Sequence, residues 1–177
     1  MKRLLVFLRQ EIYFIFFTWY IFIWIPLILA FIFLGTRIDI LLGLHKFIPR
    51  PYNILFFAFF ISMGVIIVLW SYSYLVFEGR MKKPTLYFGQ TEKLVTVGPY
   101  SIVRHPAVIG KIFSVIGLGF LFQSFSFTFI IIPILFVGSI IDKMFREERQ
   151  LTKKWGKEYI EYKKSVPMII PKIKRRD

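Results

Sequence analysis

The stretch that decides the fold is residues 112–141, IFSVIGLGFLFQSFSFTFIIIPILFVGSII, where no side chain is charged over 30 residues. As a single helix it would be about 45 Å long, whereas the hydrocarbon core of a bilayer is roughly 30 Å thick. Gln123, Ser124 and Ser126 place polar groups near its middle. We therefore predict that this stretch folds into a tight hairpin of two membrane-spanning helices.

Two earlier stretches, residues 12–36 and 51–77, also lack charged side chains. Each exceeds the roughly 18 residues that a spanning helix needs. The chain is 56% hydrophobic with a mean hydropathy of +0.64, which excludes an ordinary soluble globule. We expect an all-α integral membrane protein with about four transmembrane helices, the last two of which form the hairpin.

The distribution of basic residues predicts the orientation. Of 24 Lys and Arg residues, 21 lie in segments 2–11, 80–111 and 143–176, and the other three are Arg37, Lys46 and Arg50. Because Lys and Arg collect on the cytoplasmic side, four spans place both termini and the segment after residue 77 in the cytoplasm. The net charge of +14 in so apolar a chain indicates anionic lipid headgroups as partners, and no nucleic acid. The absence of Cys and the presence of only two His argue against a metal site.

Two segments predicted to be cytoplasmic carry most of the polar residues. Residues 78–105 are interrupted by Pro84, Gly89, Gly98 and Pro99, which predicts an irregular loop. Residues 142–165 predict an amphipathic helix whose apolar residues recur at helical spacing, with Gly156 at a break or close contact. The sequence thus divides into N-terminal transmembrane helices, 1–77, and a catalytic half, 78–177. The apolar stripe consists of Leu151, Trp155, Tyr159, Tyr162 and Val166.

Short motifs in the second half are ambiguous when each is taken alone. Arg104 and His105 at a membrane boundary are typical of headgroup contacts as well as of catalysis. Glu147 and Glu148 beside basic residues are equally typical of a solvated helix face. The small residues of the hairpin favour close packing of helices: Gly110, Ser114, Gly117 and Gly119.

Taken together, four strings form a specific pattern: LVTxGxY at 94–100, RHPxxxG at 104–110, EExxL at 147–151 and WGxEYxEYKKxVPxxIP at 155–171. In this pattern the chain resembles the isoprenylcysteine carboxyl methyltransferase family and the related membrane phospholipid methyltransferases. The resemblance covers residues 94–171. It implies an S-adenosyl-L-methionine pocket formed by the loop before the hairpin, the Arg-His-Pro turn and the C-terminal helix.

Site residues follow from the resemblance, motif by motif. It implies cofactor contacts, with Glu148 adjoining them, and an acceptor-binding cation at the position of Lys143, for which Arg146 could substitute. From the chemistry of the side chains we expect catalytic roles for Glu148 and Arg146, and no metal. Two positions depart from the family pattern, because Val108 replaces a Tyr and Lys143 replaces an Arg. A Lys keeps the charge but lacks the bidentate geometry that suits a carboxylate. The residues expected to contact the cofactor are Leu94, Val95, Tyr100, His105, Pro106 and Glu147.

The resulting hypothesis is a multi-pass membrane methyltransferase that uses S-adenosyl-L-methionine at the cytoplasmic face. Its expected partner is a lipidic methyl acceptor that enters from the bilayer, such as an isoprenylated cysteine carboxylate. Phospholipid N-methylation is the alternative within the same chemistry, and there Glu148 or His105 would take the proton of the amine. A non-catalytic membrane anchor with a polybasic tail is the alternative from another class. The sequence leaves the oligomeric state open.

Overall fold

The computed structural model describes residues 2–81 and 91–171, with side chains from residue 22 onward. Every regular element in these residues is helical, as the sequence predicts. Two of the elements, η2 and η3, are single π-helical turns within longer helical runs. The elements are α1 (Lys2–Leu41), α2 (Tyr52–Phe77), α3 (Pro99–Ile102), α4 (Pro106–Phe122), η2 (Phe127–Ile131), α5 (Ile132–Asp142), η3 (Lys143–Glu147), α6 (Glu148–Trp155) and α7 (Lys157–Ser165).

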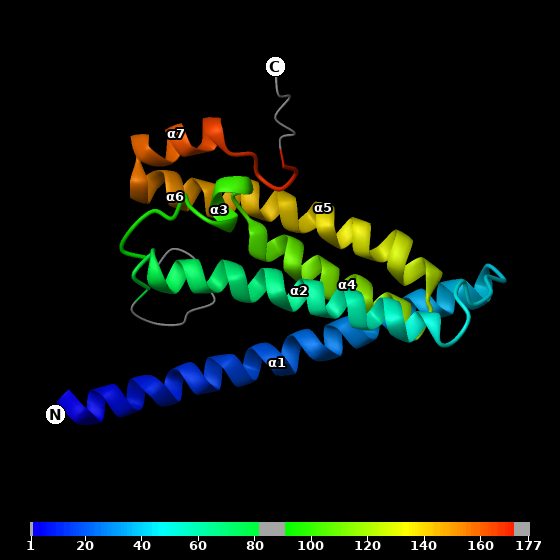
Figure 1. The fold of residues 1–177 in the computed structure, drawn as a ribbon. Helices are drawn as coiled ribbons and strands as arrows, with labels where there is room; N and C mark the ends of the chain where they lie inside the picture. The colour runs from blue at the N-terminus through cyan, green and yellow to red at the C-terminus, as the bar shows by residue number, and fades with distance from the viewer. Residues whose placement is uncertain (1, 82–90, 172–177) are drawn as a thin grey trace, which may run out of the picture.

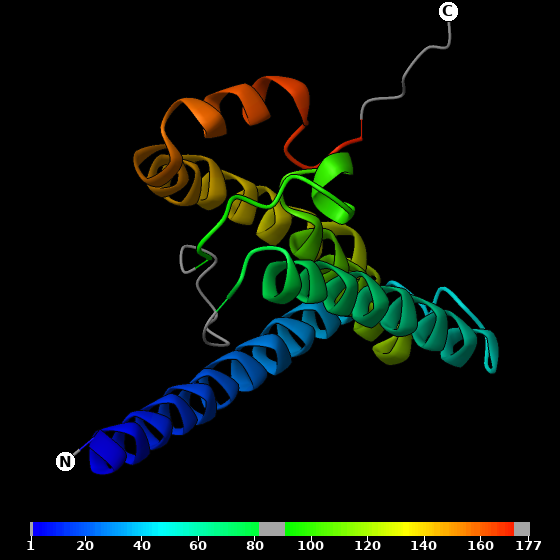
Figure 2. The ribbon, with the colours of Figure 1, turned by 60° about the vertical axis from the view of Figure 1, so that its left-hand side comes forward.

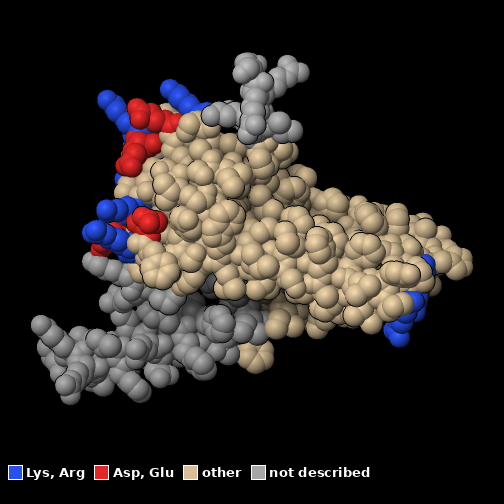
Figure 3. All heavy atoms as spheres, viewed as in Figure 1, with Lys and Arg blue, Asp and Glu red and all other residues tan. Residues whose placement is uncertain are grey.

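Three helical segments are long and apolar enough to cross a membrane: Phe22–Leu41, Tyr52–Phe77 and Phe127–Trp155. The fourth expected span corresponds to α4, which is apolar but has only 17 residues. The helices of the core run back and forth along one direction (Figure 1). On the face shown in Figure 3, charged side chains gather at the end formed by α6 and α7, with a smaller basic group at the far end. The surface between these ends carries no charged residue in this view, as expected for helices in lipid.

Helices α2 and α4 approach each other closely because small residues face each other. A Cβ on Gly64 would lie 2.6 Å from the Gly110 carbonyl oxygen, and one on Gly110 would lie 2.7 Å from the Gly64 carbonyl oxygen. Ser114 also lies against Gly64. Close backbone packing by small residues is a common way to join helices in a membrane, where lipid supplies no hydrophobic drive. The packing role predicted for Gly110 and Ser114 is confirmed.

The predicted hairpin is confirmed, and its turn lies at the predicted polar residues. Helix α4 ends at Phe122, Gln123 adopts a left-handed conformation with φ of 57°, and the chain returns through η2 and α5. Asp39 of α1 holds this turn, since it accepts hydrogen bonds from Ser124 Oγ at 2.6 Å and Ser126 N at 2.8 Å. All three residues are buried. The C-terminal part of α1 therefore crosses the hairpin at its turn (Figures 1 and 2).

The region for which a single C-terminal helix was predicted contains two helices. The run from α5 through η3 continues into α6 and ends at Trp155, and Gly156, with φ of 56°, turns the chain into α7. Apart from its chain neighbours, the described part of the chain places no atom within 4 Å of a Cβ at Gly156, so this glycine marks the break. The predicted stripe packs into one cluster together with Leu94 of the preceding loop. The polybasic segment predicted at 171–176 lies outside the described residues from position 172 onward.

Candidate active site

A cleft lies at the charged end of the molecule, where the segment 91–105 meets α6 and α7. Its lining combines apolar and aromatic side chains with a few ionisable ones, the usual composition of a small-molecule site. The residues come from the end of α2, the loop and α3, the start of α4, η3, α6 and α7. They are Leu75, Thr91, Leu94, Val95, Tyr100, Arg104, His105, Ala107, Val108, Glu147, Leu151, Trp155, Tyr159 and Tyr162.

Backbone hydrogen bonds fix the Arg-His turn that forms one wall of this cleft. The amide of Arg104 donates to the Pro167 carbonyl oxygen at 2.9 Å, and that of His105 donates to the Met168 carbonyl oxygen at 3.1 Å. The Tyr162 hydroxyl of α7 donates to the Tyr100 carbonyl oxygen at 2.6 Å. Helix α7 and the segment that follows it therefore bind the loop before α4. The motifs at 94–100 and 104–110 thereby meet the motif at 155–171.

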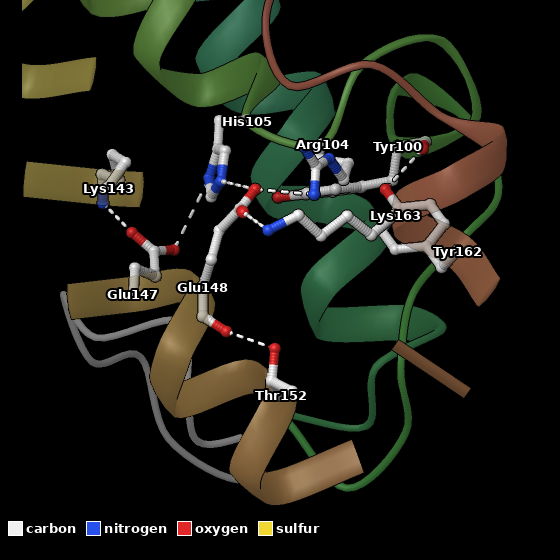
Figure 4. Close-up of polar contacts among 9 residues, drawn as sticks. All are labelled: Tyr100, Arg104, His105, Lys143, Glu147, Glu148, Thr152, Tyr162 and Lys163. Carbon is white, nitrogen blue, oxygen red and sulfur yellow. Dashed lines mark hydrogen bonds and ion pairs between the residues drawn. The ribbon is translucent and has the colours of Figure 1, made fainter. Parts of the chain in front are cut away.

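Glu148 is the buried centre of a charged cluster (Figure 4). One carboxylate oxygen lies 2.7 Å from Arg104 Nη1 and the other lies 2.6 Å from Lys163 Nζ. The side chains of Glu148 and Arg104 are 3% and 8% exposed, whereas that of Lys163 is 46% exposed. A buried carboxylate needs such partners, because burial of an unpaired charge is strongly unfavourable. Both oxygens of Glu148 are thus engaged within the protein.

His105 lies between the two adjacent glutamates. Its Nδ1 is 3.7 Å from a Glu147 carboxylate oxygen and its Nε2 is 3.7 Å from a Glu148 carboxylate oxygen. Adjacent residues of a regular helix point about 100° apart. The π-helical turn η3 ends at Glu147, the first residue of this pair, and widens the helix where both carboxylates face the histidine. Such π-turns are frequent at functional sites.

The two cations predicted to bind the acceptor occupy different positions. Lys143 of η3 forms an ion pair with Glu147, which lines the cleft, and its side chain is 23% exposed. Arg146 is 82% exposed and pairs with Asp142 at 2.8 Å on the outer face of the helix. The structure therefore brings Lys143 to the edge of the cleft and leaves Arg146 outside it.

The Tyr100 hydroxyl is buried and has no hydrogen-bond partner among the described residues, although its ring lines the cleft. Burial, together with the negative charge of Glu147 and the proximity of Tyr162, raises the pKa of Tyr100 far above 10. The hydroxyl is therefore a neutral donor throughout the physiological range. Buried polar groups normally have a partner, so a donor aimed into a cleft indicates a site for a polar ligand.

Five of the six residues predicted to contact the cofactor line the cleft, and the sixth, Pro106, begins α4 directly behind His105. Glu148 lies beside the cleft and outside its lining, and holds Arg104. The sequence motifs did not indicate the contribution of Thr91 and of the aromatic residues of α6 and α7 to the lining. The signal for the latter was available, because hydroxyl-bearing Tyr159 and Tyr162 lie on an otherwise apolar stripe.

A comparison with known protein families bears on this cleft. The family model described as phospholipid methyltransferase matches residues 53–158, more than half of the chain. The chain belongs to the phospholipid methyltransferase family. This is the family of the isoprenylcysteine carboxyl methyltransferase-like membrane methyltransferases, so the resemblance found in the sequence is confirmed. No curated protein and no solved structure gives a significant match to this methyltransferase.

Membership establishes the class of chemistry. The protein is a membrane methyltransferase, and enzymes of this family generally use S-adenosylmethionine. The matched range includes the loop, the Arg-His turn, the hairpin and the glutamate pair, which together supply most of the cleft lining.

Proposed function

We propose that this methyltransferase binds S-adenosyl-L-methionine in the cleft and methylates the carboxylate of a lipidic acceptor, such as an isoprenylated cysteine. The observation that carries the proposal is the meeting of loop 94–105 with the glutamate pair and α7 around one cleft. The cleft lies at the charged end of otherwise apolar helices (Figures 3 and 4). There a polar cofactor can enter from water while a lipid approaches from the membrane.

The residues of the cleft fit this cofactor. Glu147, whose side chain is 16% exposed, would pair with its ammonium group, and the Tyr100 hydroxyl would donate to one of its oxygens. Leu94, Val95 and Trp155 offer apolar and aromatic surface for the adenine ring. The imidazole of His105 would form hydrogen bonds at the ribose or methionyl end, and Pro106 fixes where α4 begins. When bound, the cofactor would supply an electrophilic methyl group for transfer to the acceptor atom, with the demethylated thioether as the leaving group.

The protein's own contribution to the transfer is alignment and exclusion of water. An α-carboxylate with a pKa of about 3.3–3.7 is already ionised at neutral pH, so no general base is required. A mostly apolar wall removes water from that anion, and Lys143 would hold it in place. Glu148 would act by positioning Arg104 and His105, because its oxygens are already engaged by Arg104 and Lys163.

Phospholipid N-methylation is the second candidate function, favoured by the description of the matching family. An amine acceptor must lose a proton before it attacks. His105 is the better candidate for that proton, since its side chain lines the cleft, whereas Glu148 lies outside the lining and is ion-paired with Arg104 and Lys163. The two candidates therefore differ in whether the reaction needs a base near neutral pH.

We further propose a multi-pass topology with the cleft on the cytoplasmic side. The distribution of Lys and Arg in the sequence supports this orientation, because 21 of the 24 lie in segments 2–11, 80–111 and 143–176. Charged side chains of the described residues gather at the end formed by α6 and α7, where the cleft lies. Single Cys residues at positions 47 and 170 should therefore react with a membrane-impermeant reagent from opposite sides. Labelling of both from the same side would contradict the four-span topology.

A labelled-methyl transfer assay tests the function. Membranes that contain the protein are incubated with methyl-labelled S-adenosylmethionine, and the lipid products are treated with alkali. A methyl ester releases volatile methanol, whereas a methylamine keeps its label. Volatile label in wild-type membranes, and none with Glu147→Ala, supports carboxyl methylation. Alkali-stable label shows the phospholipid reaction instead, and purified protein that binds no cofactor would leave only the anchor hypothesis.

A further inference from the structure

Lys111 is the one charged residue in the sequence of α4. At 100° per residue it projects between the directions of Ala107 and Val108, both of which line the cleft. It lies one helical turn further along α4, on the membrane side of the cleft. Its side chain is exposed. Charged residues within apolar membrane helices are rare and usually functional, so this lysine is a candidate functional residue.

Lys143 occupies the corresponding position on the opposite side of the hairpin. Glu147 lines the cleft, and Lys143 precedes it by one turn, again toward the membrane. Helix α4 and the α5–η3 run are antiparallel (Figure 1), and the 3.7 Å contact of His105 with Glu147 sets the two at the same level. The Lys111 ammonium is within electrostatic range of both Lys143 and Glu147.

The charges of these three side chains do not balance. Two ammonium groups face one carboxylate, so Lys111, Lys143 and Glu147 together carry +1. Lys143 already forms an ion pair with Glu147, whereas Lys111 forms none with the described residues. Like charges near one another in a poorly hydrated place repel unless an anion lies between them. The missing counter-charge is thus negative and belongs on the membrane side of the cleft.

We infer that Lys111 and Lys143 form the binding site for the anionic group of the lipid acceptor. The inference rests on the proposed function. It adds Lys111, which none of the sequence motifs includes, and specifies a negatively charged group at the membrane side of the cleft. A carboxylate and a phosphodiester share the required chemistry, because both present oxygens to ammonium donors. A lysine that only extends its ammonium toward headgroups would contribute nothing to acceptor binding.

Calorimetry on the purified protein in a neutral detergent tests the site by binding alone. The probes are N-acetyl-S-farnesylcysteine, its uncharged methyl ester, and a short-chain phosphatidylethanolamine. The variants are Lys111→Gln, Lys111→Arg and, as a matched control, Lys157→Gln, which removes an exposed lysine of α7. Lys111→Gln should weaken binding of an anionic probe about tenfold, the usual order for one charge-assisted contact. Lys111→Arg and Lys157→Gln should bind like the wild type, and no variant should change the affinity for the methyl ester or for S-adenosylmethionine.

The farnesylcysteine carboxylate and the phosphodiester of the zwitterionic phospholipid separate the two sources of negative charge. A loss confined to farnesylcysteine identifies a carboxylate acceptor, and a loss confined to the phospholipid identifies a phosphate. Unchanged binding of both probes by Lys111→Gln, an equal loss for the methyl ester, or no binding by the wild type overturns the inference. If the binding losses occur but the wild type methylates neither probe, the proposed function fails and the anion site stands. If methylation occurs and Lys111→Gln binds normally, only the anion site fails.

Discussion

Substitutions in the ion pair between Arg104 and Glu148 test whether this charged cluster is buried and mutually dependent. Their side chains are 8% and 3% exposed and meet at 2.7 Å. Removing one partner leaves the other charge buried without compensation, which typically costs about 3–5 kcal/mol. The second partner of Glu148, Lys163, is 46% exposed and contributes little to this figure. We therefore expect Glu148→Leu and Arg104→Met each to lower the free energy of unfolding by about 3–5 kcal/mol.

The double variant distinguishes this reasoning from ordinary packing loss. Replacing a buried ion pair by apolar groups of similar volume is often neutral, so Arg104→Met/Glu148→Leu should be more stable than either single variant. Unfolding can be followed by tryptophan fluorescence during titration of a mild-detergent micelle with a denaturing detergent. Lys153→Met, an exposed change on α6, serves as a control that should leave stability within about 0.5 kcal/mol. Additive losses in the double variant would refute the buried-pair account.

Four other perturbations have expected outcomes. Glu147→Ala should weaken S-adenosylmethionine binding in calorimetry by roughly 10- to 150-fold, through loss of a charge-assisted contact of about 1.5–3 kcal/mol. Lys143→Ala should raise the acceptor KM while Arg146→Ala, which removes an 82% exposed side chain, leaves it unchanged. Because burial raises the pKa of Tyr100 above its unfolded value near 10, the protein should lose stability as pH rises above about 10, and Tyr100→Phe should lessen that loss in thermal melts. Asp39→Ala should lower stability by about 1–3 kcal/mol, since two buried donors at the hairpin turn lose their acceptor; equal melting curves would contradict this.

Much of the fold was predictable because lipid imposes simple rules. Uncharged length and the polar residues at 123–126 were enough to place the hairpin turn, whereas Gly156 was expected to mark either a break or a close contact, and the structure shows the break. Helical periodicity identified the stripe that packs with Leu94. These features depend on local composition and spacing, which a sequence shows directly.

The features that could not be predicted depend on the direction in which each helical side chain points and on contacts between segments distant in the sequence. The π-helical turn η3 leaves no simple mark in the sequence, yet it changes the direction of every later side chain in that run. For that reason the sequence could not show that Lys143 reaches the cleft edge whereas Arg146 points outward. The partners of Asp39 and Glu148 likewise lie far along the chain, at Ser124 and at Arg104 and Lys163. Such pairings require the folded arrangement.

Arg104 and Glu148 lie far apart in the sequence, which determines when their ion pair can form during biosynthesis. The ribosome adds about 5–20 residues each second, so the 44 residues between positions 104 and 148 take roughly 2–9 s to appear. Throughout that interval Arg104 lacks its partner Glu148, and the carbonyl groups that will accept hydrogen bonds from the Arg104 and His105 amides, at Pro167 and Met168, do not yet exist. The hairpin between them must also enter the bilayer first. Assembly of the cleft is therefore a late event of biosynthesis. Until Glu148 is made, Arg104 must stay in water and must not enter the membrane together with α4.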